Sequence, residues 1–194
     1  MMRPETSIGS LLSVVSLLFA MGWGSGSELV AESEPSLESE PVLLGPLTRE
    51  EIEMAMPEWV AAEVEARPDM DAAAEMITAL ENAEVTVFMG TWCSDSGREL
   101  PRLWRALDEL GVLNPDQIRY IGVDRDKLEP EEWVAGSHLQ LVPTIVVSRD
   151  GKEAGRIIES SPNGIERDLL ALLRGERVGV ITASDDFESG GEGH

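Results

Sequence analysis

Glu84-Val-Thr-Val-Phe-Met-Gly-Thr-Trp-Cys-Ser-Asp-Ser96 joins a short apolar run to a polar loop that holds Cys93, the single cysteine of the chain. The run Glu84–Met89 is rich in β-branched and aromatic residues and lacks helical spacing, so it predicts a buried strand. From Ser94 to about Leu110 the apolar residues instead follow the helical period. They form one stripe of a predicted helix: Leu100, Leu103, Trp104, Leu107 and Leu110. The cysteine therefore lies between a buried strand and the first turn of a helix.

Strands and helices alternate on the C-terminal side of this segment. A strand–helix–strand unit predicts parallel pairing, whereas the tight turn at Asp150-Gly151 predicts an antiparallel hairpin. The expected fold class is α/β, with a mixed central sheet and helices on both faces. The expected elements are strands at Ile118–Val123, Leu141–Val147 (interrupted by Pro143) and Glu153–Glu159, and helices at Glu129–Ala135 and from Pro162 to about Leu173.

Two helices are predicted on the N-terminal side, within residues 47–81. Thr48 is typical of a helix N-cap, and the helix that follows it is broken or kinked near Pro57. Asp69 is typical of the N-cap of the second helix. We interpret 47–81 as an N-terminal helical extension of a domain at 82–176.

The flanks of these segments are acidic and show no apolar period. Residues 28–46 alternate glutamate with serine and proline, and the end of segment 177–194 is similar. Such a composition does not bury enough apolar surface to fold alone. We therefore expect a disordered acidic linker at 28–46 and an acidic C-terminal tail at 177–194.

The first 27 residues are typical of an export signal. Arg3 precedes a nearly unbroken apolar run at Ile8–Gly22, whose length suits the core of a signal peptide and is short for a membrane span. We expect a protein exported to the periplasm or the extracellular space, with a signal peptide at 1–27. The alternative is an uncleaved N-terminal membrane anchor, and without one no membrane contact is expected.

The composition excludes several classes of function. The chain has 194 residues and a formal net charge of -22, from 37 acidic and 15 basic residues, so nucleic acid is not an expected partner. One cysteine excludes an internal disulfide and a four-cysteine zinc site, and two histidines are too few for a histidine-rich metal site. Neither a metal nor a cofactor is predicted. Asp124 and Asp126 follow a predicted strand and are interpreted as turn residues.

Three features at fixed spacing resemble the thioredoxin superfamily. Trp92-Cys93 ends a strand, Pro101 follows eight residues after the cysteine, and Val142-Pro143-Thr144 precedes the hairpin. The resemblance covers residues 82–176 and implies a thioredoxin-like three-layer fold. It also implies that Pro101 kinks the helix after Cys93 and that the Val142–Pro143 peptide bond is cis.

The resemblance assigns roles to these residues. Cys93, at a helix N-terminus, is implied to be a nucleophilic thiolate stabilised by the helix dipole and by backbone N–H groups. Trp92 is implied to shelter one side of the sulfur. Trp92, Val142, Pro143 and Thr144 are the implied binding site of an extended substrate peptide, which pairs with the Val142 backbone.

The chain departs from the family at the second thiol. Ser96 stands where a dithiol enzyme has its resolving cysteine, and a serine hydroxyl does not attack a disulfide at ordinary pH. Val87 stands where thioredoxins keep a buried acid. Asp95 places a carboxylate near Cys93 that opposes the thiolate, and Arg98 offsets part of that charge.

Two functional hypotheses follow. The first is a monothiol oxidoreductase or isomerase-like protein that engages protein or small-molecule disulfides and thiols and needs an external thiol for resolution. Its candidate catalytic residues are Cys93, Ser96, Trp92, Asp95 and Pro143. The alternative is a redox-inactive binding module for extended client peptides. Both a monomer and a Cys93-linked dimer are compatible with the sequence.

The remaining conspicuous side chains have simpler interpretations. Trp104 and Trp133 are expected to pack in the core or at an interface. His138 is expected in a solvated loop. Arg98 and Glu99 are expected on a solvated helix face.

Overall fold

A computed structural model of the chain describes residues 41–113 and 115–184. The signal peptide or anchor predicted at 1–27, the linker up to residue 40 and the tail from residue 185 lie outside the described residues. None of the helices in the described part is both long and apolar enough to cross a membrane.

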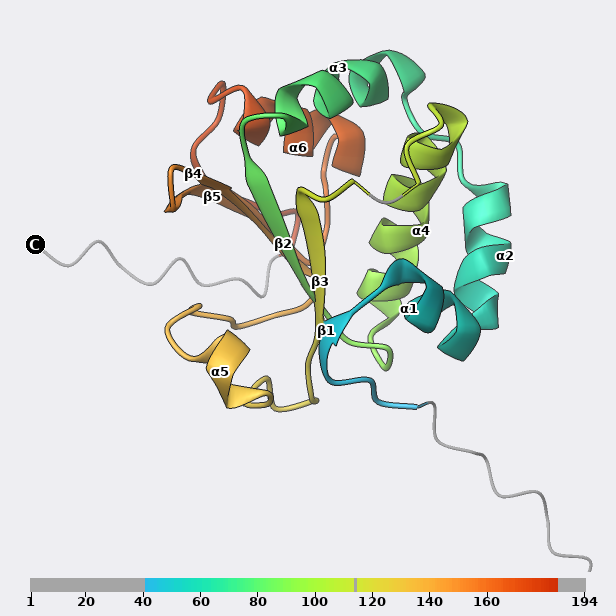
Figure 1. Cartoon of the computed structure of the whole chain (residues 1–194), viewed down its shortest axis with the longest axis vertical. Helices are drawn as coiled ribbons and strands as arrows, with labels where there is room; N and C mark the ends of the chain where they lie inside the picture. Colours follow the sequence, from blue (N-terminus) through green and yellow to red (C-terminus); the bar gives the residue numbers. More distant parts are fainter. Residues whose placement is uncertain (1–40, 114, 185–194) are drawn as a thin grey trace, which may run out of the picture. The chain divides into compact units, whose positions relative to one another are not determined.

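The centre of the fold is a mixed six-stranded sheet with the order β1-β3-β2-β4-β5-β6 (Figure 1). The strands are β1 Gly45–Leu47, β2 Glu84–Met89, β3 Ile118–Gly122, β4 Thr144–Arg149, β5 Lys152–Ile158 and β6 Gly179–Ile181. β2 is parallel to β3 and antiparallel to β4, while β4 and β5 form the expected antiparallel hairpin. The predicted mixed sheet is confirmed.

Helices cover both faces of the sheet, as predicted, in an architecture compatible with a thioredoxin-like three-layer fold. On one face, Val87 and Met89 of β2 belong to a large core. This core also contains Trp104 and other buried apolar residues of the helices at 70–80, 94–109 and 165–173. On the opposite face, Phe88 belongs to a smaller cluster against which Trp133 of the fifth helix packs. The alternation of side chains along β2 therefore supplies both cores. The helices are α1 Arg49–Ala55, α2 Pro57–Glu65, α3 Met70–Leu80, α4 Ser94–Glu109, α5 Glu131–Val134 and α6 Ile165–Leu173 (Figure 1).

The N-terminal helices begin where the sequence predicts. Thr48 Oγ1 accepts a hydrogen bond from the Glu51 N–H (3.2 Å), and the Glu51 carboxylate accepts one from the Thr48 N–H (2.8 Å), which forms a capping box. Asp69 Oδ1 accepts hydrogen bonds from two backbone N–H groups at the start of α3. Pro57 occupies the first turn of α2, where its missing N–H is tolerated, so the predicted break separates α1 from α2.

The edge strands correct the expected linker and tail. Gly45 and Pro46 were assigned to the linker at 28–46 but belong to β1, which pairs with β3. The tail assigned to 177–194 contains β6, which pairs with β5, and Ile181 is buried in the core. Both errors have one cause, because these strands are only three residues long and depend on hydrogen bonds to distant strands.

Thr91, in the loop after β2, fixes the chain that leads into β1. Its hydroxyl donates a hydrogen bond to the Pro41 carbonyl oxygen and accepts one from the Leu43 N–H (3.4 Å). The described chain therefore starts directly beside the loop that carries Cys93.

Two other elements differ from their predicted bounds. β4 begins at Thr144 rather than at Leu141, because the preceding Pro143 has no N–H to donate to a neighbouring strand. α5 is a single turn over Glu131–Val134 instead of the predicted Glu129–Ala135. The N-terminus of this short helix has no side-chain cap.

Arg49 joins the N-terminal helices to α4. Its guanidinium donates to both carboxylate oxygens of Glu63 in α2 (2.9 Å each) and to Asp108 in α4 (2.5 and 2.8 Å), and it also pairs with Glu53. It lies 5.2 Å from the centroid of the buried Trp104 ring. Burial raises the pKa of Glu63 and the nearby Asp108 adds to this increase, whereas Arg49 opposes it. The helical extension is therefore tied to the core through one buried cation.

Arg49→Met is expected to lower the free energy of unfolding by about 3 kcal/mol at pH 7, because the buried Glu63 carboxylate loses its cation. This loss is expected to shrink as the pH falls from 7 towards about 4. Without Arg49 the pKa of Glu63 in the folded protein lies further above its unfolded value, so protonation favours the folded state. Urea denaturation at several pH values measures both effects.

Arg67→Met is the matched control, because the exposed Arg67 donates only to backbone carbonyl groups. Its stability is expected to equal that of the wild type. A loss for Arg49→Met that grows as the pH falls would contradict the assignment of Arg49 as the partner of a buried carboxylate.

Candidate functional site

The Cys93 loop meets the Val142–Pro143 peptide because β2 and β4 are antiparallel neighbours. Phe88, near the end of β2, pairs with Thr144, the first residue of β4. Residues that follow β2 therefore lie against residues that precede β4. The Cys93 thiol donates a hydrogen bond to the Val142 carbonyl oxygen, and the sulfur and oxygen are 3.1 Å apart. The Val142–Pro143 bond is cis, as predicted.

Cys93 is the N-cap residue of α4 and is half-buried. Its backbone is extended; its N–H donates to the Gly90 carbonyl (3.0 Å), and its carbonyl accepts from the Gly97 N–H (3.1 Å). Pro101 lies inside α4, two turns further on. The thiol makes no helix-capping hydrogen bond. The sulfur therefore lies at the positive end of the α4 dipole, and the thiol donates its hydrogen bond to the Val142 carbonyl oxygen.

Trp92 is fixed beside this sulfur by its indole N–H, which donates to the Val123 carbonyl oxygen (3.0 Å). Its ring lies against Gly90, where an added Cβ would come within 2.5 Å of the indole. The side chains of Arg125 and Lys127 stand over the ring, 5.2 and 5.9 Å from its centroid. The Trp92 ring is therefore held in place by the hydrogen bond of its one polar atom.

Ser96 is fully buried, and its Oγ accepts a hydrogen bond from the Gly90 N–H (3.3 Å). This bond links the first turn of α4 to the end of β2. Val87 is fully buried in the larger core. Ser96 therefore has a structural hydrogen-bond partner of its own.

Asp95 and Arg98 form an ion pair in the first turns of α4. Arg98 also donates to Glu99 (3.2 Å) and to the Glu159 carbonyl oxygen (3.4 Å). The expectation of a solvated face at 98 and 99 is wrong for Glu99, which is 7% exposed. The positive partner expected for Asp95 is therefore present.

Val142, Pro143 and Thr144 offer backbone groups rather than side chains. All three are buried, and the Thr144 hydroxyl donates to the Leu141 carbonyl oxygen (2.6 Å). The Pro143 carbonyl accepts from the Glu159 N–H (2.8 Å). Within the described residues the Val142 N–H has no acceptor. Within the described residues, the Val142 N–H is therefore an unpaired backbone donor.

A groove of about 440 Å³ opens beside the thiol, between α2 and the Cys93 loop. The α2 side of this groove was not predicted from the sequence. The residues of α2 show an ordinary amphipathic pattern, and no local sequence feature places them near residue 93. Gly97 is the sequence feature that reflects the contact between α2 and α4, because it lies against the Trp59 ring. The groove is lined by Met56, Glu58, Trp59, Ala62, Thr91, Trp92, Cys93, Ser94 and Gly97.

The side chains with simpler interpretations lie outside the groove. Trp104 is fully buried in the core and Trp133 packs on the smaller cluster, as predicted. His138 is exposed in its loop, and its carbonyl oxygen accepts from Arg156 (3.5 Å). Asp124 forms the predicted turn, with Oδ1 accepting from two backbone N–H groups (2.8 and 2.9 Å). None of these residues lines the groove.

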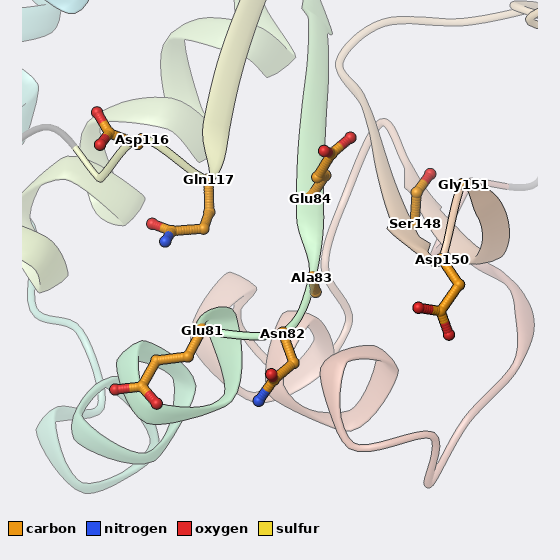
Figure 2. Close-up of a pocket in the computed structure, with 9 residues that line it drawn as sticks. All are labelled: Glu81, Asn82, Ala83, Glu84, Asp116, Gln117, Ser148, Asp150 and Gly151. Atoms are coloured by element: carbon orange, nitrogen blue, oxygen red, sulfur yellow. The ribbon is translucent and has the colours of Figure 1, made fainter.

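A second hollow, of about 380 Å³, lies at the opposite end of the sheet (Figure 2). It surrounds the start of β2, whereas Cys93 follows its end. Figure 2 shows the carboxylates of Glu81, Glu84, Asp116 and Asp150 pointing away from one another. Across residues 41–113 and 115–184, no group of three or more His, Cys, Asp and Glu side chains is arranged to hold a metal ion. The acidic side chains of this hollow are solvated charges.

Comparison with known proteins identifies no relative. The chain matches no protein-family model, no curated protein and no solved structure. The functional assignment therefore depends on the residues and geometry of the site.

Ser96→Ala is expected to lower the free energy of unfolding by about 1–2 kcal/mol, because the buried Gly90 N–H loses its acceptor. Alkylation of Cys93 by iodoacetamide is expected to proceed at close to the wild-type rate, since the Cys93 contacts do not involve Oγ. Thermal unfolding and the alkylation rate test the two parts. Ser94→Ala, at an exposed position in the same turn, is the control for stability; a large loss of thiol reactivity in Ser96→Ala would assign Ser96 a chemical role instead.

Proposed function

We propose that this chain is a monothiol member of the thioredoxin superfamily that exchanges disulfides through Cys93. The observation that carries the proposal is the placement of one sulfur. Cys93 Sγ lies at the N-terminus of α4, 3.1 Å from the carbonyl oxygen that precedes the cis Pro143, and at the side of an open groove. A helix N-terminus favours the thiolate, which is the nucleophile of disulfide exchange.

The reaction is one exchange at a time. The Cys93 thiolate attacks one sulfur of a disulfide, a Cys93–sulfur bond forms, and the other sulfur leaves as a thiolate. Ser96 has no thiol to attack this adduct, so an external thiol displaces Cys93 and takes over the bond to the client. Isomerisation of protein disulfides and removal of small-thiol adducts both fit this cycle, because neither needs a second cysteine.

The protein-facing part of the proposed site is the backbone before β4. The Val142 N–H, which has no acceptor among the described residues, would pair with an extended peptide, and the Cys93 sulfur lies 3.1 Å from the carbonyl oxygen of the same residue. Trp92 borders this site and is held rigid by its bond to Val123. We propose Trp92 and 142–144 as the binding residues for a peptide client.

A redox-inactive binding module is the second candidate, and one observation favours it. The Cys93 proton is engaged by the Val142 carbonyl oxygen, and this bond exists only in the thiol form. A module that stays in this form would hold an extended client through the same backbone without covalent chemistry.

We also propose that the chain works after export, in the periplasm or outside the cell, on the basis of residues 1–27. A free thiol in such a compartment requires a supply of reducing thiol, because oxidants would otherwise cap Cys93. This requirement agrees with a cycle that depends on an external thiol.

Incubation of the purified chain with oxidised glutathione is expected to add one glutathionyl group, and added thiol is expected to remove it. Cys93→Ala is expected to remain unmodified. Mass spectrometry across a pH series measures both the adduct and its release. A thiol that stays inert in a folded protein would overturn exchange and leave the binding module.

Ser96→Cys is expected to convert the stable adduct into a transient one. The new thiolate attacks Cys93 Sγ, a 93–96 disulfide forms, and glutathione leaves without any external thiol. The wild-type adduct is expected to persist under the same conditions. Spontaneous release from the wild type would show that another group resolves the adduct.

A further inference from the structure

Two tryptophans border Cys93, and each lies against a glycine. Trp92 packs on Gly90 on the side of the loop. Trp59, from α2, packs on Gly97 in the first turns of α4, where an added Cβ would lie 2.8 Å from the indole nitrogen. Trp59 and Trp92 both line the groove beside the thiol.

The two indoles differ in their hydrogen bonding. Trp92 Nε1 donates to a backbone carbonyl, but Trp59 Nε1 has no acceptor within the described part of the chain. Trp59 is 4% exposed, so a polar atom has been retained on a nearly buried ring. The fully buried side-chain nitrogens and oxygens without a partner are found at Ser161 and Glu166. The Trp59 nitrogen is not one of them, so it is accessible to solvent, and it lies next to Gly97, which lines the groove.

A solvent-accessible N–H donates to water until another acceptor takes the place of that water. The apolar part of Trp59 already packs on Trp104, with ring centroids 6.1 Å apart, and this packing does not need a nitrogen. The N–H is therefore available to a group that enters the groove. That group is the one attached to Cys93 in the mixed disulfide, since the sulfur lines the same groove.

We infer that Trp59 is a positioning residue of the Cys93 site, whose indole N–H donates a hydrogen bond to a backbone carbonyl oxygen of the peptide held on Cys93. The inference rests on the proposed exchange at Cys93. Glu58 is the only charged residue among those that line the groove in the described structure. Its negative charge disfavours a carboxylate as the acceptor and leaves a neutral peptide carbonyl. The preferred substrate is therefore a peptide disulfide rather than an anionic small disulfide.

The test compares two disulfides that differ in their acceptors. The symmetrical disulfide of N-acetylcysteine methylamide carries neutral peptide carbonyls, and cystamine carries none. Trp59→Phe is expected to slow adduct formation with the peptide disulfide by about threefold to tenfold and to leave the cystamine rate unchanged. Trp133→Phe is the matched control, because Trp133 does not line the groove, and it is expected to change neither rate.

A measurement on the wild-type chain tests the inference even if the Trp59→Phe variant does not fold. In ¹⁵N-labelled protein, the Trp59 indole N–H resonance is expected to move downfield in the peptide adduct and to stay in place in the adduct formed from cystamine. Equal slowing with both disulfides, or an unmoved Trp59 resonance, would overturn the inference. Failure of the wild type to react with either disulfide would instead overturn the proposed exchange, so the two failures are distinguishable.

Discussion

The pairing of β2 with β4 is the constraint on which the site depends. The register Phe88 with Thr144 brings the end of one strand to the start of the other, and Cys93 and Val142 lie in the loops that continue from there. A shift by one residue would turn every side chain of β2 to the opposite face and would move Met89 out of the core. The large hydrophobic core therefore fixes the relation between the sulfur and its backbone partner, although the site itself contains few residues.

Much of this arrangement could be predicted from local patterns, because each pattern has a local physical cause. The apolar run of β2, the caps Thr48 and Asp69, and the hairpin turn before β5 all depend on neighbours within a few residues. The edge strands β1 and β6 could not be predicted in this way, since three residues carry no period. The burial of Glu99 and the approach of α2 to the thiol depend on contacts between distant helices. Local composition gives no information about such contacts.

Residues of the same type have different roles around the sulfur, and only their hydrogen-bond partners distinguish these roles. The resemblance places Ser96 at the position of a second thiol, but its oxygen accepts a hydrogen bond from the Gly90 N–H. Replacement by alanine therefore tests its structural role, and replacement by cysteine tests the proposed chemistry. Trp92 and Trp59 look alike in sequence, yet within residues 41–113 and 115–184 the Trp92 nitrogen has a hydrogen-bond acceptor and the Trp59 nitrogen has none. The motif locates the proposed chemistry, whereas the hydrogen bonds distinguish structural groups from those available to the proposed client.

The contact between Thr91 and Pro41 has a consequence for anything joined to the N-terminal side of the fold. Because Thr91 precedes Trp92 by one residue, the incoming backbone is fastened on the same face of the protein as the thiol. A disulfide carried by a partner tethered upstream of residue 41 would meet Cys93 as a neighbour within one assembly. Its effective concentration would then be set by the length of the tether rather than by diffusion from bulk solution.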